Sequence, residues 1–312
     1  MGSALLGIVS GFVLLTGAAE ALVYGAASVA RRVGLSPLVI GLTVVSIGTS
    51  LPELVVSLDA AVGSTEGLAL GNVVGSNIGN LALILGVAAL VRPLVIKAQV
   101  VRVEAPILIA VSGVFAAMIV DGDLSRLDGV ILVGGIVAYV VYTLRMAQRS
   151  SASVRAEYEE GIPSHHSVWL DVAAIAFGLL GLIGGAHVLV EGAIGIARRL
   201  GVGPIVIGLT IVAVGTSLPE LATSVVAARR GQGDLAVGNA LGSSVFNLLG
   251  ILGVTALIHP LSTAALGWVE TGIMVGVALL ILPLFRSDWT LTRTEGLFLL
   301  ICYGAYLTYL FL

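Results

Sequence analysis

The chain has 312 residues, of which 58% are hydrophobic and only 11% are charged. Because a soluble domain carries about 25% charged residues, this composition excludes a protein whose whole surface faces water. The formal net charge of −3 leaves no excess of basic side chains for binding nucleic acid, and the single cysteine, Cys302, excludes a disulfide framework and a cysteine metal site.

Apolar segments long enough to cross a bilayer, which takes about 20 residues, follow one another along the chain. In chain order they are predicted at about 4–26, 37–62, 68–91, 104–120, 128–147, 169–191, 204–228, 235–258, 268–285 and 294–312. The polar stretch 148–168 predicts a linker between the fifth and sixth segments. We therefore expect an all-α integral membrane protein with ten transmembrane helices. The first segment is expected to be retained, because no positive charge precedes it as in a secretory signal.

Basic residues predict the orientation of these helices, because short cytoplasmic loops collect lysine and arginine. With the N-terminus outside, twelve of the fifteen basic residues fall in inside loops, and only Arg126, Arg198 and Arg199 fall outside. We therefore predict that both termini lie outside and that the 148–168 linker is cytoplasmic.

The two halves of the chain repeat one another at an offset of 167 residues. Residues 37–53 and 204–220 are identical at 13 of 17 positions, PLVIGLTVVSIGTSLPE against PIVIGLTIVAVGTSLPE. Residues 71–90 and 238–257 are identical at 12 of 20 positions. Each unit contains five spans, an odd number, so the second copy crosses the membrane in the opposite direction, which is the design of inverted-repeat transporters. The predicted units are residues 1–147 and 169–312.

Two glutamates, Glu53 and Glu220, lie deep in the second and seventh spans at equivalent positions of the repeat. A charge at the bilayer centre costs at least about 2.5–3.5 kcal/mol, so these residues are candidates for function. Hydroxyl side chains share the helix face of each glutamate, and the third and eighth spans add polar pairs at i, i+4 spacing. These side chains are Ser46, Thr49, Ser50, Thr216, Ser217, Ser76, Asn80, Ser243 and Asn247.

Prolines next to the glutamates bring backbone oxygens into the same set. Pro52 and Pro219 donate no hydrogen bond and displace the carbonyl four residues earlier, so nearby carbonyls, including those of Ser46 and Ala213, are expected to be available as ligands. Hard cations such as calcium prefer an all-oxygen set of this kind, whereas soft metals prefer cysteine or histidine. The alternative, in which the hydroxyls cap kinks and the glutamates are structural, explains a single polar residue better than a duplicated set.

Other polar residues have simpler interpretations. Glu20 and Glu191, near the ends of the first and sixth spans, are expected to snorkel or to pack in pairs. Asn72 and Asn239 are expected to cap helix starts or to bond across the bundle.

The doubled GTSLPE stretches at 48–53 and 215–220, with GNVVGSNIGN at 71–80 and GNALGSSVFN at 238–247, resemble the alpha repeats of the calcium/cation antiporter superfamily. The closest resemblance is to prokaryotic sodium/calcium exchangers, and it covers essentially the whole chain. It implies a central ion site formed by spans two, three, seven and eight, with helices one and six sliding against this core. The liganding set that the resemblance implies is Ser46 (carbonyl), Thr49, Ser50, Glu53, Ser76, Asn80, Ala213 (carbonyl), Thr216, Ser217, Glu220, Ser243 and Asn247.

One position departs from the pattern of the better-known exchangers, which often carry aspartate where this chain has Asn247. The site therefore has two carboxylates rather than three, enough to neutralise one calcium or two sodium ions. A third sodium ion would leave a net positive charge in a low-dielectric site, which is unfavourable.

The function that we expect is exchange of calcium for sodium across the plasma (inner) membrane by alternating access. The transported ions would be calcium and sodium, with no cofactor, no nucleic acid, and no partner beyond membrane lipid. A proton/calcium antiporter on the same fold is the first alternative, with the glutamates titrating as calcium leaves. A passive channel suits paired inverted motifs less well. An intramembrane hydrolase is remote, since no histidine lies near Ser50 or Ser217 and no HExxH motif is present; we expect no enzyme.

The predicted topology is testable by cysteine labelling. Ser151→Cys in a Cys302→Ala background should stay unlabelled when an impermeant thiol reagent is added to intact, right-side-out cells, because the linker faces the cytoplasm. Labelling from outside without permeabilisation would overturn the orientation.

Overall fold

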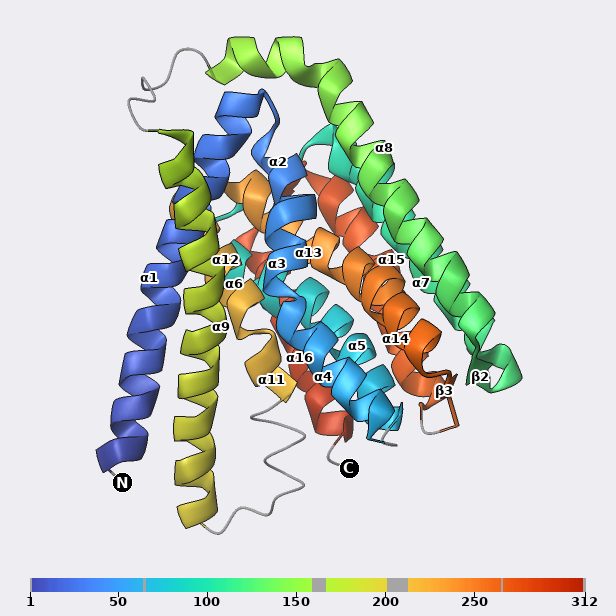
Figure 1. Ribbon diagram of the computed structural model, residues 1–312. Coiled ribbons are helices and arrows are strands. Elements are labelled where there is room, and N and C mark those ends of the chain that lie inside the picture. The colour runs from blue at the N-terminus through green and yellow to red at the C-terminus, as the bar shows by residue number, and fades with distance from the viewer. Residues whose placement is uncertain (1, 64–65, 159–166, 201–212, 265, 311–312) are drawn as a thin grey trace.

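The computed structural model describes residues 2–63, 66–158, 167–200, 213–264 and 266–310, and nearly all of them are helical (Figure 1). The elements of the first half are α1 Gly2–Val33, α2 Pro37–Ile40, α3 Ser46–Thr49, α4 Leu51–Val62, α5 Glu66–Ile78, α6 Leu85–Val91, β1 Leu94–Val95, α7 Ala105–Met118, β2 Asp123–Leu124 and α8 Arg126–Tyr158. Those of the second half are α9 Val168–Arg199, α11 Ala213–Thr216, α12 Leu218–Arg229, α13 Gly233–Phe246, α14 Leu252–Ile258, β3 Leu261–Ser262, α15 Trp268–Ser287, β4 Thr290–Leu291 and α16 Arg293–Leu310. Several helices run on through π-helical segments, at Gly41–Val45, Gly79–Ile84, Val100–Glu104 and Asn247–Ile251.

The all-helical membrane fold is confirmed. Among the described residues, seven helices are long and apolar enough to cross a membrane, and the bent pair Pro37–Thr49 and Leu51–Val62 makes an eighth candidate. The predicted seventh span, 204–228, lies partly outside the described residues. Helix α16, Arg293–Leu310, overlaps the predicted tenth span, 294–312, but is not one of the seven helices. The count of ten spans therefore stays a prediction.

Helix boundaries differ from the predicted ones where polar residues continue a helix. The predicted linker 148–168 begins as helix, because α8 continues to Tyr158, and α9 begins at Val168; residues 159–166 lie outside the described part of the chain. The stretch from 148 to 158 is polar but contains good helix formers such as alanine, arginine and glutamate. Hydropathy marks where a helix leaves the membrane and not where it ends.

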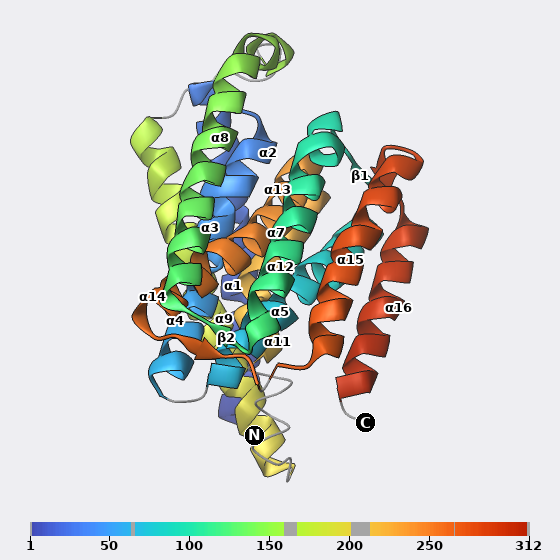
Figure 2. The same cartoon turned by 90° about the vertical axis from the view of Figure 1, so that its right-hand side faces the viewer.

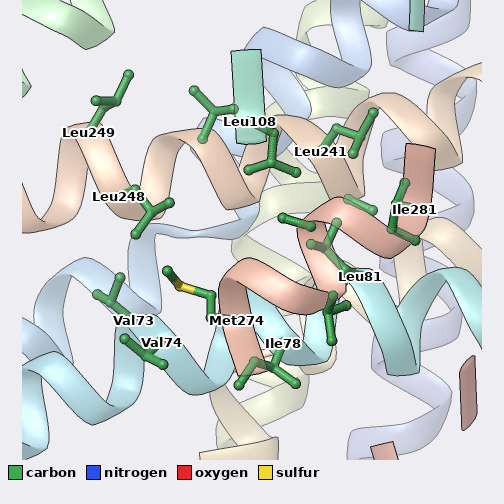
Figure 3. Close-up of a cluster of buried hydrophobic side chains, with 14 of the residues drawn as sticks. Val73, Val74, Ile78, Leu81, Leu108, Leu241, Leu248, Leu249, Met274 and Ile281 are labelled. Carbon is green, nitrogen blue, oxygen red and sulfur yellow. The ribbon is translucent and has the colours of Figure 1, made fainter. Parts of the chain in front are cut away.

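Two central helices form the core of the molecule. In the apolar stretches of Glu66–Val91 and Gly233–Ile258, 78% of the residues are buried, against 22–33% in the other long helices. Figure 3 shows part of the cluster that these helices bury with their neighbours; it labels Val73, Val74, Ile78, Leu81, Leu108, Leu241, Leu248, Leu249, Met274 and Ile281. Figure 2 shows α7 and α15, which pack together at the edge of this core. The outer helices expose large apolar side chains, as in Phe177, which is 73% exposed, and this suits a surface in contact with lipid.

Helices α1 and α9 form a closely packed antiparallel pair (Figure 1). A Cβ atom on Gly178 of α9 would lie 2.7 Å from the backbone nitrogen of Leu22 in α1, closer than atoms can pack. Small residues permit such an approach between membrane helices. At the end of the pair, the Arg32 guanidinium binds the carboxylate of Asp171, which is buried.

Two short ladders relate the halves of the chain. At the 167-residue offset, β1 corresponds to β3 and β2 corresponds to β4. Leu94 of β1 pairs with Leu291 of β4, and Leu124 of β2 pairs with Leu261 of β3. The β1–β4 pair and the β2–β3 pair are therefore equivalent, and each joins a strand of the first half to a strand of the second half.

The packing of α1 on α9 predicts a difference between two glycines of one helix. Gly178→Val should destabilise the protein by about 1–3 kcal/mol, because the added side chain must push the α1 backbone away. Gly184→Val carries the same helix-propensity cost, but a Cβ atom there meets nothing within 4 Å. Thermal unfolding of the detergent-solubilised variants measures the difference, and equal losses would contradict the close packing.

Candidate ion-binding site

Both helices that carry the glutamates are broken one turn before the carboxylate. Ser50, between α3 and α4, has φ −87° and ψ 8°, and Ser217, between α11 and α12, has φ −88° and ψ 5°. Pro52 and Pro219 each lie in the first turn of the new helix, where a proline is tolerated because its missing N–H would have no partner there. In the first half the break bends the helix by 43°. Each helix is therefore interrupted beside its proline, whereas the use of the Ser46 and Ala213 carbonyls as ligands stays a prediction.

The breaks bring the two halves into contact through their serines and glutamates. Ser50 Oγ donates to Glu220 Oε1 over 2.8 Å, and Ser217 Oγ lies 3.3 Å from Glu53 Oε1. Ser217 Oγ also lies 3.4 Å from Ser76 Oγ. Each serine therefore reaches the glutamate of the other repeat, and both glutamates are only 1% exposed.

Further hydroxyls gather at the break of the first half. Ser243 Oγ lies 3.4 Å from the carbonyl oxygen of Ser46, which also accepts from the backbone nitrogen of Ser50. Thr49 is 1% exposed, and its Oγ1 lies 3.2 Å from Asn239 Oδ1. A Cβ atom on Gly242 would lie 2.7 Å from the Cα of Leu42, so only glycine lets α13 approach this closely.

Asn80 and Asn247 occupy matching places in the central helices. Asn247 begins a π-helical segment and Asn80 is the second residue of the other, and such segments occur often at functional sites because the extra residue redirects side chains. Both side chains are 1% exposed. Thr216 is half-buried at the end of α11. Ala213 begins α11, and its side chain lies outside the described part of the structure.

Oxygen atoms at the centre of this group have no hydrogen-bond partner although they are buried. Within the described residues these atoms include Glu53 Oε2, Glu220 Oε2, Asn80 Oδ1 and Asn247 Oδ1. None of the ion pairs in the described residues involves either glutamate. A buried carboxylate without a positive partner costs several kcal/mol, so the arrangement is suited to a bound cation.

Glu104 provides a contrast within the same structure, and it was not predicted. This carboxylate is also 1% exposed, but both of its oxygens accept hydrogen bonds: Oε1 from Gln99 Nε2 over 2.8 Å and Oε2 from the Tyr139 hydroxyl over 3.0 Å. No sequence pattern marked Glu104 as buried, because residue 104 stood at the predicted boundary of the fourth span.

Three of the four residues with simpler interpretations make side-chain contacts, and the fourth, Glu191, is exposed on α9. Glu20 of α1 forms an ion pair with Arg230, which follows α12, as a packing pair would. Asn72 and Asn239 bond across the bundle, each to the helix that carries a glutamate. The sequence feature that marked both asparagines is the GN pair that each repeat contains, at 71–72 and 238–239.

Comparison with known proteins gives consistent results. A model of the family described as sodium/calcium exchanger protein matches residues 3–145 and 170–312, two segments at the same 167-residue offset. The putative antiporter CaxA of Alkalimonas amylolytica is 36% identical over 310 residues, which cover 97% of each chain. Inner membrane protein YrbG of Escherichia coli (strain K12) is 39% identical over 263 residues, covering 81% of this chain and 79% of the relative. Among solved structures, the sodium-calcium exchanger NCX_Mj matches with a TM-score of 0.86 and 31% identity over 99% of both chains.

Proposed function

The chain belongs to the sodium/calcium exchanger protein family, and from this premise we propose that it exchanges calcium for sodium by alternating access. As a member of this family it is an integral, multi-pass membrane protein that exchanges cations. The observation that carries the proposal is the pair of buried glutamates from the two halves, each with one oxygen that has no hydrogen-bond partner. A transported cation supplies the missing positive charge.

The proposed arrangement in the membrane has ten spans in two inverted repeats, residues 1–147 and 169–312, with both termini outside and the 148–168 linker in the cytoplasm. The paired ladders at a common offset support the two repeats. The plasma membrane is the proposed location, and the name of the relative YrbG, an inner membrane protein, supports it.

The proposed ion ligands are the twelve residues that the motifs indicate: Ser46, Thr49, Ser50, Glu53, Ser76, Asn80, Ala213, Thr216, Ser217, Glu220, Ser243 and Asn247. Calcium takes 6–8 oxygen ligands, and this set offers carboxylate, hydroxyl, amide and carbonyl oxygens. The cross-contacts of Ser50 with Glu220 and of Ser217 with Glu53 support a single site shared by the two halves.

Sodium is the proposed counter-ion, with the proton as the alternative. The motifs of the third and eighth spans carry neutral Ser76, Asn80, Ser243 and Asn247, so they add no titratable group that could exchange a proton for calcium. The test is calcium uptake into proteoliposomes with sodium, proton and potassium gradients imposed separately. Uptake driven by the proton gradient alone would replace sodium with the proton.

Removing either glutamate charge should abolish transport. Glu53→Gln and Glu220→Gln are each expected to lower calcium uptake to the level of empty liposomes, because each removes half of the charge that balances calcium. Glu104→Gln is the matched control, since both oxygens of that carboxylate have protein partners, and it should keep most of the activity. Near-normal uptake by either of the first two variants would refute the site.

The charge of the site also predicts electroneutral exchange of two sodium ions for one calcium ion. Moving one elementary charge changes the free energy by about 2.3 kcal/mol per 100 mV, so an electrogenic exchanger would shift its calcium accumulation ratio roughly fiftyfold per 100 mV, whereas this protein should show no shift. Asn247→Asp adds a third carboxylate and is expected to make the flux sensitive to the potential. A potential-dependent ratio in the native protein, measured with potassium and valinomycin, would contradict two-for-one exchange.

A further inference from the structure

An asparagine lies behind each of the two glutamates. Asn72 of α5 donates from Nδ2 to the backbone carbonyl of Glu53 over 3.2 Å and to Ser57 Oγ over 3.0 Å. In the other half, Asn239 of α13 donates to the carbonyl of Glu220 over 3.3 Å and to Ser224 Oγ over 3.0 Å. All three residues of each set correspond at the 167-residue offset, so the same clamp is built twice.

The clamps replace a stabilising contact that the helices lack. Ser50 and Ser217 occupy the N-cap positions of α4 and α12, where a serine hydroxyl ordinarily accepts a backbone N–H of the first turn. Neither serine makes this bond, because its hydroxyl reaches the glutamate of the opposite half instead. The first turn of each helix carries the glutamate, and the asparagine ties that turn to the neighbouring central helix.

Asn239 has a second contact that joins the halves. Its Oδ1 lies 3.2 Å from the Thr49 hydroxyl, while its Nδ2 holds α12. The Thr49 hydroxyl also lies 3.4 Å from the carbonyl oxygen of Ser46, so Asn239 offers its single hydrogen the closer of these two acceptors and holds the hydroxyl oxygen in place. Asn239 is completely buried, whereas Asn72 is half-buried.

We propose that Asn72 and Asn239 are positioning residues that set the ion affinity of the site by fixing the first turns of α4 and α12. They contact the glutamate backbones rather than the ions. Groups that orient metal ligands typically contribute about 10–100-fold to affinity. Because Asn239 orients ligands from both halves, it contributes more than Asn72. The inference rests on the proposed function, in which the two glutamates bind the transported ions.

The test compares leucine substitutions, which remove the donors without adding charge. Asn72→Leu and Asn239→Leu should raise the calcium dissociation constant of the solubilised protein by about tenfold or more. They should also raise the KM of sodium-driven uptake more than they lower its maximal rate. Asn77→Leu is the matched control on α5: Asn77 is 1% exposed, it is not one of the twelve proposed ligands, and in the described structure it makes no hydrogen bond to a helix that carries a glutamate. It should leave both constants within about twofold.

The possible outcomes separate the clamp from the site. A purely structural role would lower the yield and the melting temperature but leave the dissociation constant of the folded protein unchanged, and that result would overturn the proposal. If Asn239→Leu does not fold, the half-buried Asn72 decides the question. Calcium binding that survives Glu53→Gln would refute the ion site itself. Loss of binding in Glu53→Gln together with unchanged affinity in both asparagine variants would refute the clamp alone.

Discussion

Two carboxylates buried in the interior of a membrane protein require positive charge close by. In this structure no basic side chain of the described residues supplies it, so the charge has to come from a bound cation. Glu53 and Glu220 are 1% exposed, and in the described residues neither takes part in an ion pair with a basic side chain. An uncompensated charge in this environment costs several kcal/mol, and in the proposed function a bound cation removes that cost. Two ions that compete for one such site exchange for one another, which is the basis of coupled antiport.

The backbone is adapted to this constraint at several places at once. An unbroken α-helix uses its backbone carbonyls in hydrogen bonds along its own axis and so offers few oxygens to a ligand. Here the breaks at Ser50 and Ser217 interrupt that pattern, and the π-helical segments that contain Asn80 and Asn247 change it again. Non-helical backbone within a membrane is tolerated where it is buried in protein, and the two central helices provide that burial.

The sequence predicted those parts of the fold and site that local patterns encode. Hydropathy predicted the helical class, and the duplicated motifs predicted the glutamates and the breaks beside the prolines. The side-chain partners of these residues could not be predicted, because a local pattern reports on one helix only. The contact of Ser50 with Glu220, for example, joins positions 170 residues apart. The same limit applies to Glu104, whose partner Tyr139 lies on a later helix. The helical extension of α8 to Tyr158 was missed because hydropathy reports the membrane boundary, whereas helix propensity continues beyond it.

Comparing the two repeats position by position shows which residues of the proposed site are the same in both halves and which differ. In the proposed alternating-access mechanism the two halves exchange roles, and the paired serines, glutamates and asparagines make the halves equivalent. The repeats nevertheless differ at some positions in and next to the proposed site. Ser46 corresponds to Ala213, and Asn77 corresponds to Ser244, both without change of charge. The two charged residues of the proposed site, Glu53 and Glu220, stay equal, so each half contributes one negative charge to a site that would hold one divalent ion or two monovalent ions in turn.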